Sequence, residues 1–401
     1  MKYLILLLSF ILCLSCSKQE VNIEEISFEF EGNNSAPNLV SNEGELTLSW
    51  ISSKRDKEAG LNYTQLKNSE WKPFKKIVSG TDWFVNWADY PANATSNDLI
   101  LTSYLKKSDS ATYSYDILLN LQKITGESVR ENFLLNTDGV NAEHGFVSMI
   151  SNKKGGFFIA WLDGRNTVGN EMHGEQHHVS MTIRTAEISK EGVIFNEQEL
   201  DSRVCDCCQT SIVMIQKGPV VIYRDRSDTE IRDIYITRQI NGIWDKPKAI
   251  HNDGWKIAGC PVNGPKIVSK ENNVAVAWFT AANNSPLVNL SFSKDGGQVF
   301  EVPVEISSGM TLGRVDVAFI NSKEVLISYM ENEDDNTFIK CRKVAIDGTI
   351  SEPLIIANVN ASRSTGVPQL EIFNKKAYVV WTISENGKKQ LKSVSFNFEA
   401  M

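Results

Sequence analysis

Cysteines and histidines, the residues that most often bind transition metals, gather in the middle of this chain. One run, Arg203-Val-Cys-Asp-Cys-Cys-Gln-Thr210, carries Cys205, Cys207 and Cys208, and Cys260 follows about fifty residues later. Four of the five histidines precede this run: His144, His173, His177 and His178. Thiolate and imidazole suit zinc or copper, and the Cys-x-Cys-Cys spacing allows several sulfurs to reach one ion. The residue types therefore indicate a metal site.

Disulfide bonding is the competing interpretation of the same cysteines. An exported chain meets an oxidising compartment, and Cys260 could pair with one of the three clustered sulfurs. Beyond Cys16 the chain has an odd number of cysteines, so at least one thiol has no internal partner. Cys341, in an alternating strand, is expected as a small buried thiol. A strained, easily reduced bond between Cys207 and Cys208 is the third alternative.

Arginines and carboxylates form a second candidate site. Arg165 and Arg224 each follow an expected strand, Arg224 is followed by Asp225, and Arg314 opens another strand. Because an arginine fork binds a carboxylate through two hydrogen bonds, these side chains could hold an acidic sugar or another carboxylate. An arginine–aspartate ladder that ties loops together would use the same residues. We interpret Arg226 as part of such a ladder.

The run from Trp83 to Tyr90 adds aromatic and polar groups to this candidate site. Trp83 and Asn86 could contact a sugar ring, although packing in the core would also explain aromatic residues here. Asp89 and Asp316 are the carboxylates that could donate a proton during catalysis.

A repeat along the chain predicts which of these segments meet. Seven short apolar strands end on or near a large aromatic residue: Trp50, Tyr104, Trp161, Tyr223, Trp278, Tyr329 and Trp381. Four strands in every unit of roughly 45 to 65 residues are typical of a β-propeller. We therefore predict an all-β fold with seven blades, or six if the long second unit is irregular.

The innermost strands are expected near Pro37, Phe84, Gly145, Cys208, Pro261, Arg314 and Val367. Four expected outermost strands contain proline, which an edge strand tolerates. The last unit has only three strands, and the alternating segment from Ile23 to Glu31 could supply the fourth and close the ring. Loops that enter a blade and loops between its second and third strands emerge on one face, so the four clustered cysteines and four histidines should share that face.

The first residues have the features of an export leader. Lys2 precedes an apolar run from Leu4 to Leu14, and Cys16 follows directly, in a pattern that resembles a bacterial lipobox. The interpretation is a signal peptide over 1–15, an acylated Cys16 with a polar tether over 16–25, and a propeller over 26–401. An ordinary signal peptide is the alternative. The expected location is the bacterial cell envelope, with the membrane as partner through a lipid anchor.

Charge excludes one class of function. The net charge is −8, and lysines and arginines are scattered singly, so the chain has no basic stripe for phosphates. We therefore do not expect nucleic acid as a partner.

Ser293-Lys-Asp295-Gly-Gly297-Gln-Val-Phe300 resembles an Asp box, the turn motif that recurs in sialidases and other propellers. The resemblance implies that serine and aspartate close a turn while the aromatic residue anchors it. With the blade pattern and the cysteine motif, the chain resembles exported sialidase-like propellers. True sialidases carry an Arg-Ile-Pro segment and three clamping arginines, and the Arg-Ile-Pro segment is missing here.

Three hypotheses follow. The first is an envelope-anchored propeller that binds a metal ion or small ligand through the cysteine and histidine cluster. The second is a sialidase-type exo-glycosidase acting on an acidic sugar, with Arg224 and Arg314 as carboxylate ligands. The third is a platform that docks a partner without catalysis, because fold alone does not fix the reaction.

Overall fold

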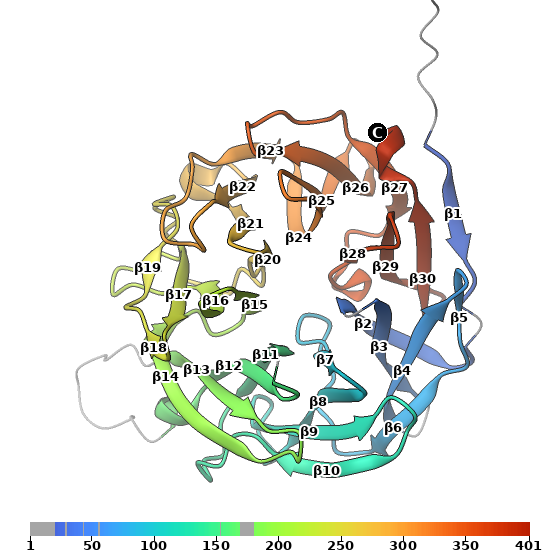
Figure 1. Cartoon of the computed structure of the whole chain (residues 1–401), viewed down its shortest axis with the longest axis vertical. Helices are drawn as coiled ribbons and strands as arrows, with labels where there is room; N and C mark the ends of the chain where they lie inside the picture. Colours follow the sequence, from blue (N-terminus) through green and yellow to red (C-terminus); the bar gives the residue numbers. More distant parts are fainter. Residues whose placement is uncertain (1–20, 29, 43, 55–56, 153, 169–179) are drawn as a thin grey trace, which may run out of the picture.

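Seven antiparallel sheets stand around a central axis in the computed structural model, which describes residues 21–28, 30–42, 44–54, 57–152, 154–168 and 180–401 (Figure 1). This arrangement confirms the seven-bladed propeller. The first four blades, from the innermost strand outwards, are β2 (Asn33–Asn42), β3 (Glu45–Ser53), β4 (Ala59–Lys67) with β5 (Glu70–Trp71) and β6 (Lys75–Gly80); β7 (Asn93–Ser96), β8 (Leu99–Lys107), β9 (Tyr115–Lys123), β10 (Ser128–Leu134); β11 (His144–Ser151), β12 (Phe157–Asp163), β13 (Met181–Ile188), β14 (Ile194–Val204); and β15 (Ser211–Ile215), β16 (Gly218–Arg224), β17 (Ile234–Ile240) with β18 (Ile243–Trp244) and β19 (Lys248–Ala249). The last three blades are β20 (Lys266–Lys270), β21 (Asn273–Thr280), β22 (Leu287–Ser293), β23 (Val304–Ser308); β24 (Thr311–Asn321), β25 (Glu324–Glu333), β26 (Asn336–Ala345), β27 (Leu354–Val359); and β28 (Gln369–Phe373), β29 (Lys376–Glu385), β30 (Lys388–Phe396), β1 (Ile23–Ile26).

The N-terminal strand closes the ring, as the alternating sequence predicts. β1 pairs antiparallel with β30, from Ile23 opposite Phe396 to Ile26 opposite Ser393. Ile26 is buried in the core that spans blades 7 and 1. The pairing covers the edge of β30 that would otherwise be open. β1 therefore begins at Ile23, inside the segment expected as a tether.

The repeated aromatic residues form the buried core between blades. All seven are the fifth or sixth residue of the second strand of their blade and are at most 6% exposed. Several also use their polar group: Trp50 donates to Asn34, Trp161 to Asp163 and Trp278 to Asp253. A large aromatic surface with one satisfied donor suits a position between two packed sheets. Because each blade buries an aromatic residue at an equivalent position, the repeat can be recognised in the sequence.

The innermost strands of three blades contain a bulge that helps to hold the next blade. Ala36, Phe146 and Arg314 have positive φ where the register of β2, β11 and β24 shifts. At Phe146 the bulge turns the main-chain N–H toward Asp89, whose two oxygens each lie 2.9 Å away. Gly145 is required beside it, because a Cβ there would lie 2.1 Å from the Asp89 carboxylate. The blade-entering loops are therefore fixed by side chains of neighbouring blades.

Two local expectations need correction. The innermost strand of blade 2 begins at Asn93 and not near Phe84, because residues 84–92 form an irregular segment that ends in Pro91. The prolines of the outer edge lie just before the outermost strands and not within them: Pro73, Pro247, Pro303 and Pro353. Proline at a strand start has no ladder hydrogen bond to lose.

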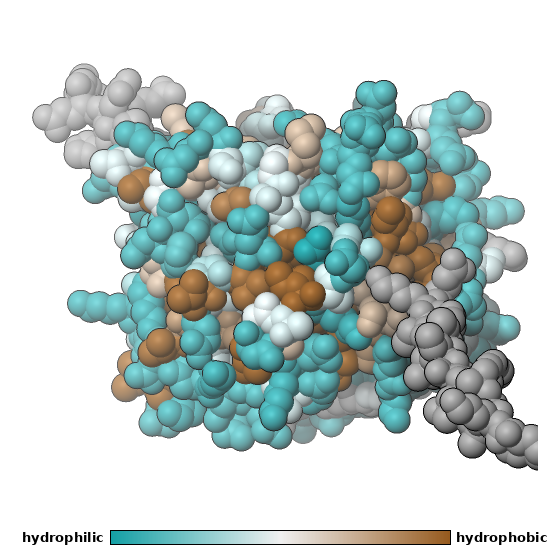
Figure 2. All heavy atoms as spheres, turned by 90° about the horizontal axis from the view of Figure 1, so that it is seen from above, coloured by the Kyte–Doolittle hydropathy of each residue, from teal (hydrophilic) through white to brown (hydrophobic). Residues whose placement is uncertain are grey.

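Among the described residues, helix is confined to four single turns: η1 (Arg165–Thr167), η2 (Ala282–Asn284), η3 (Arg363–Thr365) and η4 (Phe398–Ala400). Over the described ranges, the chain forms no helix with the length and apolar character needed to cross a membrane. Seen edge-on, the surface is mostly hydrophilic with local hydrophobic patches (Figure 2).

Candidate thiol centre

Three thiols meet in the crossover from β14 to β15. Cys205 Sγ lies 3.5 Å from Cys208 Sγ and 3.9 Å from Cys207 Sγ. β14 ends one residue before Cys205, whose amide donates to the carbonyl of Arg224 in blade 4. Cys205 and Cys208 are buried and Cys207 is half-buried. The crossover thus holds a compact sulfur cluster whose one side reaches the surface.

The fourth clustered thiol comes from the next crossover. Cys260 is exposed in the loop that precedes β20, and its interaction with Cys207 lowers the pKa of the Cys260 thiol, which places the two residues close together. Two segments that are about fifty residues apart in sequence therefore meet at one point. We call Cys205, Cys207, Cys208 and Cys260 the thiol cluster.

Neighbouring thiols and an arginine stabilise Cys205 as a thiolate. Hydrogen bonds from Cys207 and Cys208, and then Arg232, hold the pKa of Cys205 well below its usual value. Arg232 Nη1 lies 3.1 Å from Cys205 Sγ, and its other end is held by Glu230. Burial raises the pKa of Cys208 to about 12. The favoured state of the metal-free cluster is a Cys205 thiolate that accepts hydrogen bonds from its neighbours.

Ion pairs fix the loop that carries these sulfurs. Asp206 Oδ1 accepts the amide of Met181, and Asp206 Oδ2 lies 2.8 Å from Arg226 Nη1. Arg226 also binds Glu230, which in turn holds Arg232. Arg226 therefore belongs to a ladder of charges, and the ladder connects directly to the thiol cluster.

The sulfur spacing can be compared with two kinds of chemistry. A disulfide has an S–S bond of about 2.05 Å, which is much shorter than the separations in this loop. With zinc–sulfur bonds of about 2.3 Å, the sulfurs of a tetrahedral site lie about 3.8 Å apart. The distances of 3.5 and 3.9 Å match the second geometry.

Cys341 lies apart from the thiol cluster, in β26 within the hydrophobic core, where burial raises the pKa of its thiol.

His144 belongs to a separate group with two acidic residues, Asp138 and Asp163. Its Nε2 lies 3.2 Å from Asp138 Oδ2 and 3.7 Å from Asp163 Oδ1, and its Nδ1 lies 3.2 Å from the carbonyl of Tyr115. Arg165 occupies the other side of Asp163 through two side-chain hydrogen bonds. Burial alone would raise the pKa of Asp163, but the hydrogen bonds from Arg165 hold this pKa below its usual value. Because Arg165 contacts both Asp138 and Asp163, the arrangement favours a structural ion-pair group.

Three of the histidines predicted at the metal site belong to a segment that the structure does not describe. His173, His177 and His178, and the lipidation candidate Cys16, lie outside the described residues.

Arg224 and Arg314, the expected carboxylate ligands, bind the main chain. Arg224 is 1% exposed and donates four hydrogen bonds to three carbonyls, with its guanidinium 4.8 Å from the ring centre of Trp255. Arg314 donates to three carbonyls around η3 and lies over Trp87. These contacts leave Arg224 enclosed and favour a structural role for both residues.

The other expected ligand residues are also engaged locally. Trp83 stacks on Tyr104 at 4.2 Å, and Asn86 accepts the amide of Ala88. Asp225 is buried beside other acidic residues, and burial raises its pKa to about 7. Asp316 accepts the amides of Val317 and Leu370.

The turn that resembles an Asp box has the geometry that the resemblance implies. Ser293 and Asp295 bond each other and accept main-chain amides of the turn, including that of Gly297, while Phe300 packs against the core of blades 4 and 5. Ser189 forms the same kind of turn between β13 and β14. These turns lie between third and fourth strands and serve the fold.

Sequence reasoning missed three residues with prominent positions. Arg232 contacts Cys205, while Lys266 and Glu371 line the central channel. Arg232 carries no motif, and the channel residues come from different blades, so no local pattern singles them out.

Comparison with known proteins supports the fold. No family model matches the chain, and neither does any curated protein. Among solved structures, it is similar to the endosialidase of phage phi92, with a TM-score of 0.53 and 10% identity over 94% of this chain and 69% of that chain. It is also similar to an ulvan lyase, a polysaccharide lyase with a bound sugar, with a TM-score of 0.54 and 10% identity over 92% of this chain and 95% of that one.

The fold and these likenesses define the class: the chain is a seven-bladed β-propeller with a sialidase-like fold. At 10% identity the likeness extends to the fold alone.

Buried carboxylates predict the pH dependence of stability. Burial raises the pKa of Asp89 to about 8, with a smaller contribution from Glu143, and burial raises the pKa of Glu371 to about 8. The folded protein thus holds protons that the unfolded chain has released above about pH 4.5. The free energy of unfolding should fall as pH rises from about 5 to 8, by at most about 1.4 kcal/mol per pH unit for each group.

Urea denaturation at pH 5.5 and pH 8 measures this slope. Asp89→Asn, which keeps an acceptor for Phe146, should make the slope shallower, whereas the exposed Asp98→Asn should leave it unchanged. An unchanged slope in Asp89→Asn would show that Asp89 does not titrate as stated.

Proposed function

We propose that the protein is an exported propeller that binds zinc or copper through its thiol cluster. The observation that carries the proposal is the convergence of four thiols from two crossovers, with sulfur separations of 3.5 and 3.9 Å among three of them. Soft thiolates prefer these ions over magnesium or calcium. Cys205 and Cys208 would form the buried side of the site, and Cys260 would form the side open to solvent.

The surroundings support a bound cation as well. Arg232 offsets part of the negative charge that several thiolates carry and donates a hydrogen bond to Cys205, as a second layer around a metal ligand does. The charge ladder of Asp206, Arg226 and Glu230 holds the loop in place, so little ordering remains to be done when the ion binds.

Metal content and free thiols, measured together, test the proposal. Protein purified without chelators under reducing conditions should contain about one zinc or copper ion per chain, and its clustered thiols should react with a thiol reagent only after the metal is removed. Absence of metal together with disulfides among the four cysteines would contradict it and would favour the covalent interpretation.

Attachment to the bacterial envelope is the second part of the proposal. The apolar run before Cys16 supports an acylated N-terminus, and β1 begins seven residues after that cysteine, at Ile23. Cys16→Ser should move the protein from the membrane fraction to the soluble fraction; retention in the membrane fraction would contradict a lipid anchor at this residue.

A glycosidase acting on an acidic sugar is not favoured by the described residues. The hypothesis requires arginines that can reach a carboxylate, and Arg224 and Arg314 donate to main-chain carbonyls instead. Asp89 is buried under the bulge at Phe146. The similarity to a sialidase therefore supports the fold of this chain and not a sialidase reaction.

A further inference from the structure

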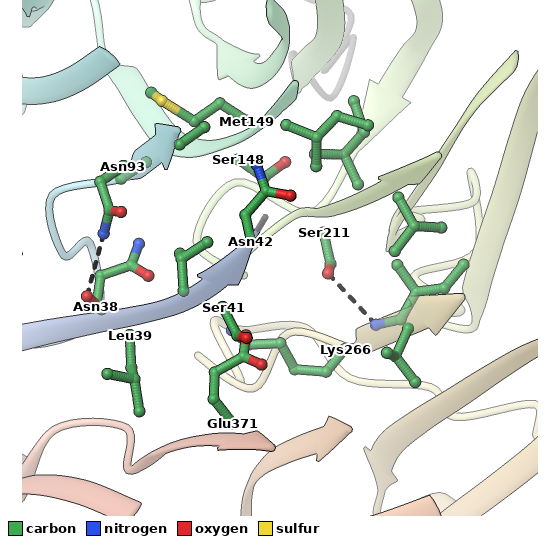
Figure 3. Close-up of a pocket in the computed structure, with 18 of the residues that line it drawn as sticks. Asn38, Leu39, Ser41, Asn42, Asn93, Ser148, Met149, Ser211, Lys266 and Glu371 are labelled. Carbon is green, nitrogen blue, oxygen red and sulfur yellow. Dashed lines mark hydrogen bonds between the residues drawn. The ribbon is translucent and has the colours of Figure 1, made fainter. Parts of the chain in front are cut away.

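The central channel contains a cavity that the thiol cluster does not line. Its volume is about 670 Å³, and its lining comes from the innermost strands of all seven blades (Figure 3). Small-molecule sites typically measure about 300–1,000 Å³. Thr210 and Lys266 in the lining follow Cys208 and Cys260 closely in sequence, so the two sites are neighbours along the chain.

Hydroxyl and amide side chains surround much of this cavity. They come from β2, β11, β15 and β20 and include Asn38, Ser41, Asn42, Ser148, Ser211 and Ser269. Figure 3 shows Asn42, Ser148 and Ser211 around one part of the cavity and Ser41 beside Glu371 in another. Apolar residues such as Met149 lie between them. The lining therefore contains both polar side chains, which can form hydrogen bonds with a ligand hydroxyl, and apolar side chains, which can pack against the carbon atoms of a ligand.

Three charged side chains lie together at one side of the described lining: Lys266, Asp316 and Glu371. Lys266 Nζ lies 3.9 Å from Asp316 Oδ1 and 5.4 Å from the ring centre of Tyr90. The Lys266 and Asp316 side chains are 17% and 11% exposed. Asp316 is held by the amides of Val317 and Leu370, so its orientation is fixed before any ligand arrives.

The positive charge of Lys266 is offset by the acidic residues beside it. Burial, together with the nearby Asp316, raises the pKa of Glu371 to about 8. Burial also raises the pKa of Asp316, and the Lys266 ammonium 3.9 Å away partly offsets that rise. A ligand with its own carboxylate would add a second negative charge beside Asp316 and next to Glu371. A neutral ligand adds no charge and can use all three groups as hydrogen-bond partners.

We infer that the channel binds a neutral polyhydroxylated molecule, a mono- or disaccharide or a similar polyol, between Lys266, Asp316, Glu371 and the hydroxyl and amide lining. Each ligand hydroxyl both donates and accepts, which matches a lining of mixed donors and acceptors. This site differs in place and chemistry from the thiol cluster, and the inference does not depend on metal binding.

Calorimetric titration of the full mature chain tests the inference. The probes are glucose, galactose, maltose and lactose, compared with glucuronate and N-acetylneuraminate. At least one neutral sugar should bind saturably at one site per chain, and the acidic sugars should bind at least tenfold more weakly. Lys266→Met should weaken binding at least tenfold, whereas Lys270→Met, an exposed lysine on the same strand, should have no effect.

A second variant keeps the test independent of the charged group. Ser41→Phe places a ring in the cavity and should abolish binding while the far-ultraviolet circular dichroism and melting temperature stay near those of the parent. Failure of every neutral sugar to bind, tighter binding of an acidic sugar, or unchanged affinity in Ser41→Phe would each overturn the inference. Cys205→Ser should lose metal and keep the sugar affinity, which separates this site from the proposed metal centre.

Discussion

Cys205→Ser should lower the affinity for zinc or copper by at least about 100-fold. Cys205 is the buried centre of the thiol cluster, lying between Cys207 and Cys208 and in contact with Arg232. A serine hydroxyl stays protonated at neutral pH and is a poor ligand for a soft ion, so the site loses one of its thiolates, and Arg232 is left beside a neutral hydroxyl group. Competition titration against a chelator of known affinity measures the change.

Cys341→Ala is the matched control for this experiment. Cys341 is also a buried thiol, but it lies in β26 within the core that spans blades 6 and 7. Its removal should leave metal affinity unchanged even if stability falls. Equal losses in both variants would mean that the effect comes from the fold, and an unchanged affinity in Cys205→Ser would contradict the assigned centre.

Arg224→Met should lower the free energy of unfolding by about 3–5 kcal/mol. The substitution keeps an unbranched apolar side chain but leaves the carbonyls of Arg232, Asn263 and Phe279 without their donors. Each buried carbonyl without a partner costs about 1–3 kcal/mol, and the contact with Trp255 is lost as well. Denaturation in guanidinium chloride followed by tryptophan fluorescence measures the difference.

Arg363→Met provides the comparison, because Arg363 is an exposed arginine in η3. Its removal should change the free energy of unfolding by less than about 0.5 kcal/mol. If Arg224→Met were as stable as the parent and instead lost binding of an acidic ligand, Arg224 would be a ligand residue, contrary to the structure.

Much of the fold could be predicted from the sequence, because the residues that repeat along the chain are the ones that the blades bury. Trp50, Trp161 and Trp278 occupy equivalent places in their blades, so their spacing predicts the blades. The closing strand was predictable for a similar reason, since Ile23 to Glu31 alternates and the last unit lacks a fourth strand. The innermost strand of blade 2 was misplaced because the apolar run before Pro91 packs as an irregular segment.

The sites could be predicted only in part. The approach of Cys260 to Cys207 follows from strand order, because both lie in loops that enter a blade on the same face. The partners of Arg224 do not follow from residue type, since a guanidinium can donate either to a ligand carboxylate or to main-chain carbonyls. The channel cavity depends on all seven innermost strands at once, so no short segment indicates Lys266 or Glu371.

X-ray absorption at the metal edge tests the central claim most directly, because it identifies the atoms bound to the ion. The account predicts three or four sulfur ligands at about 2.3 Å for bound zinc, and one sulfur ligand fewer in Cys205→Ser when the metal is supplied in excess. A spectrum of the parent protein with oxygen and nitrogen ligands alone would contradict a thiol centre between the third, fourth and fifth blades.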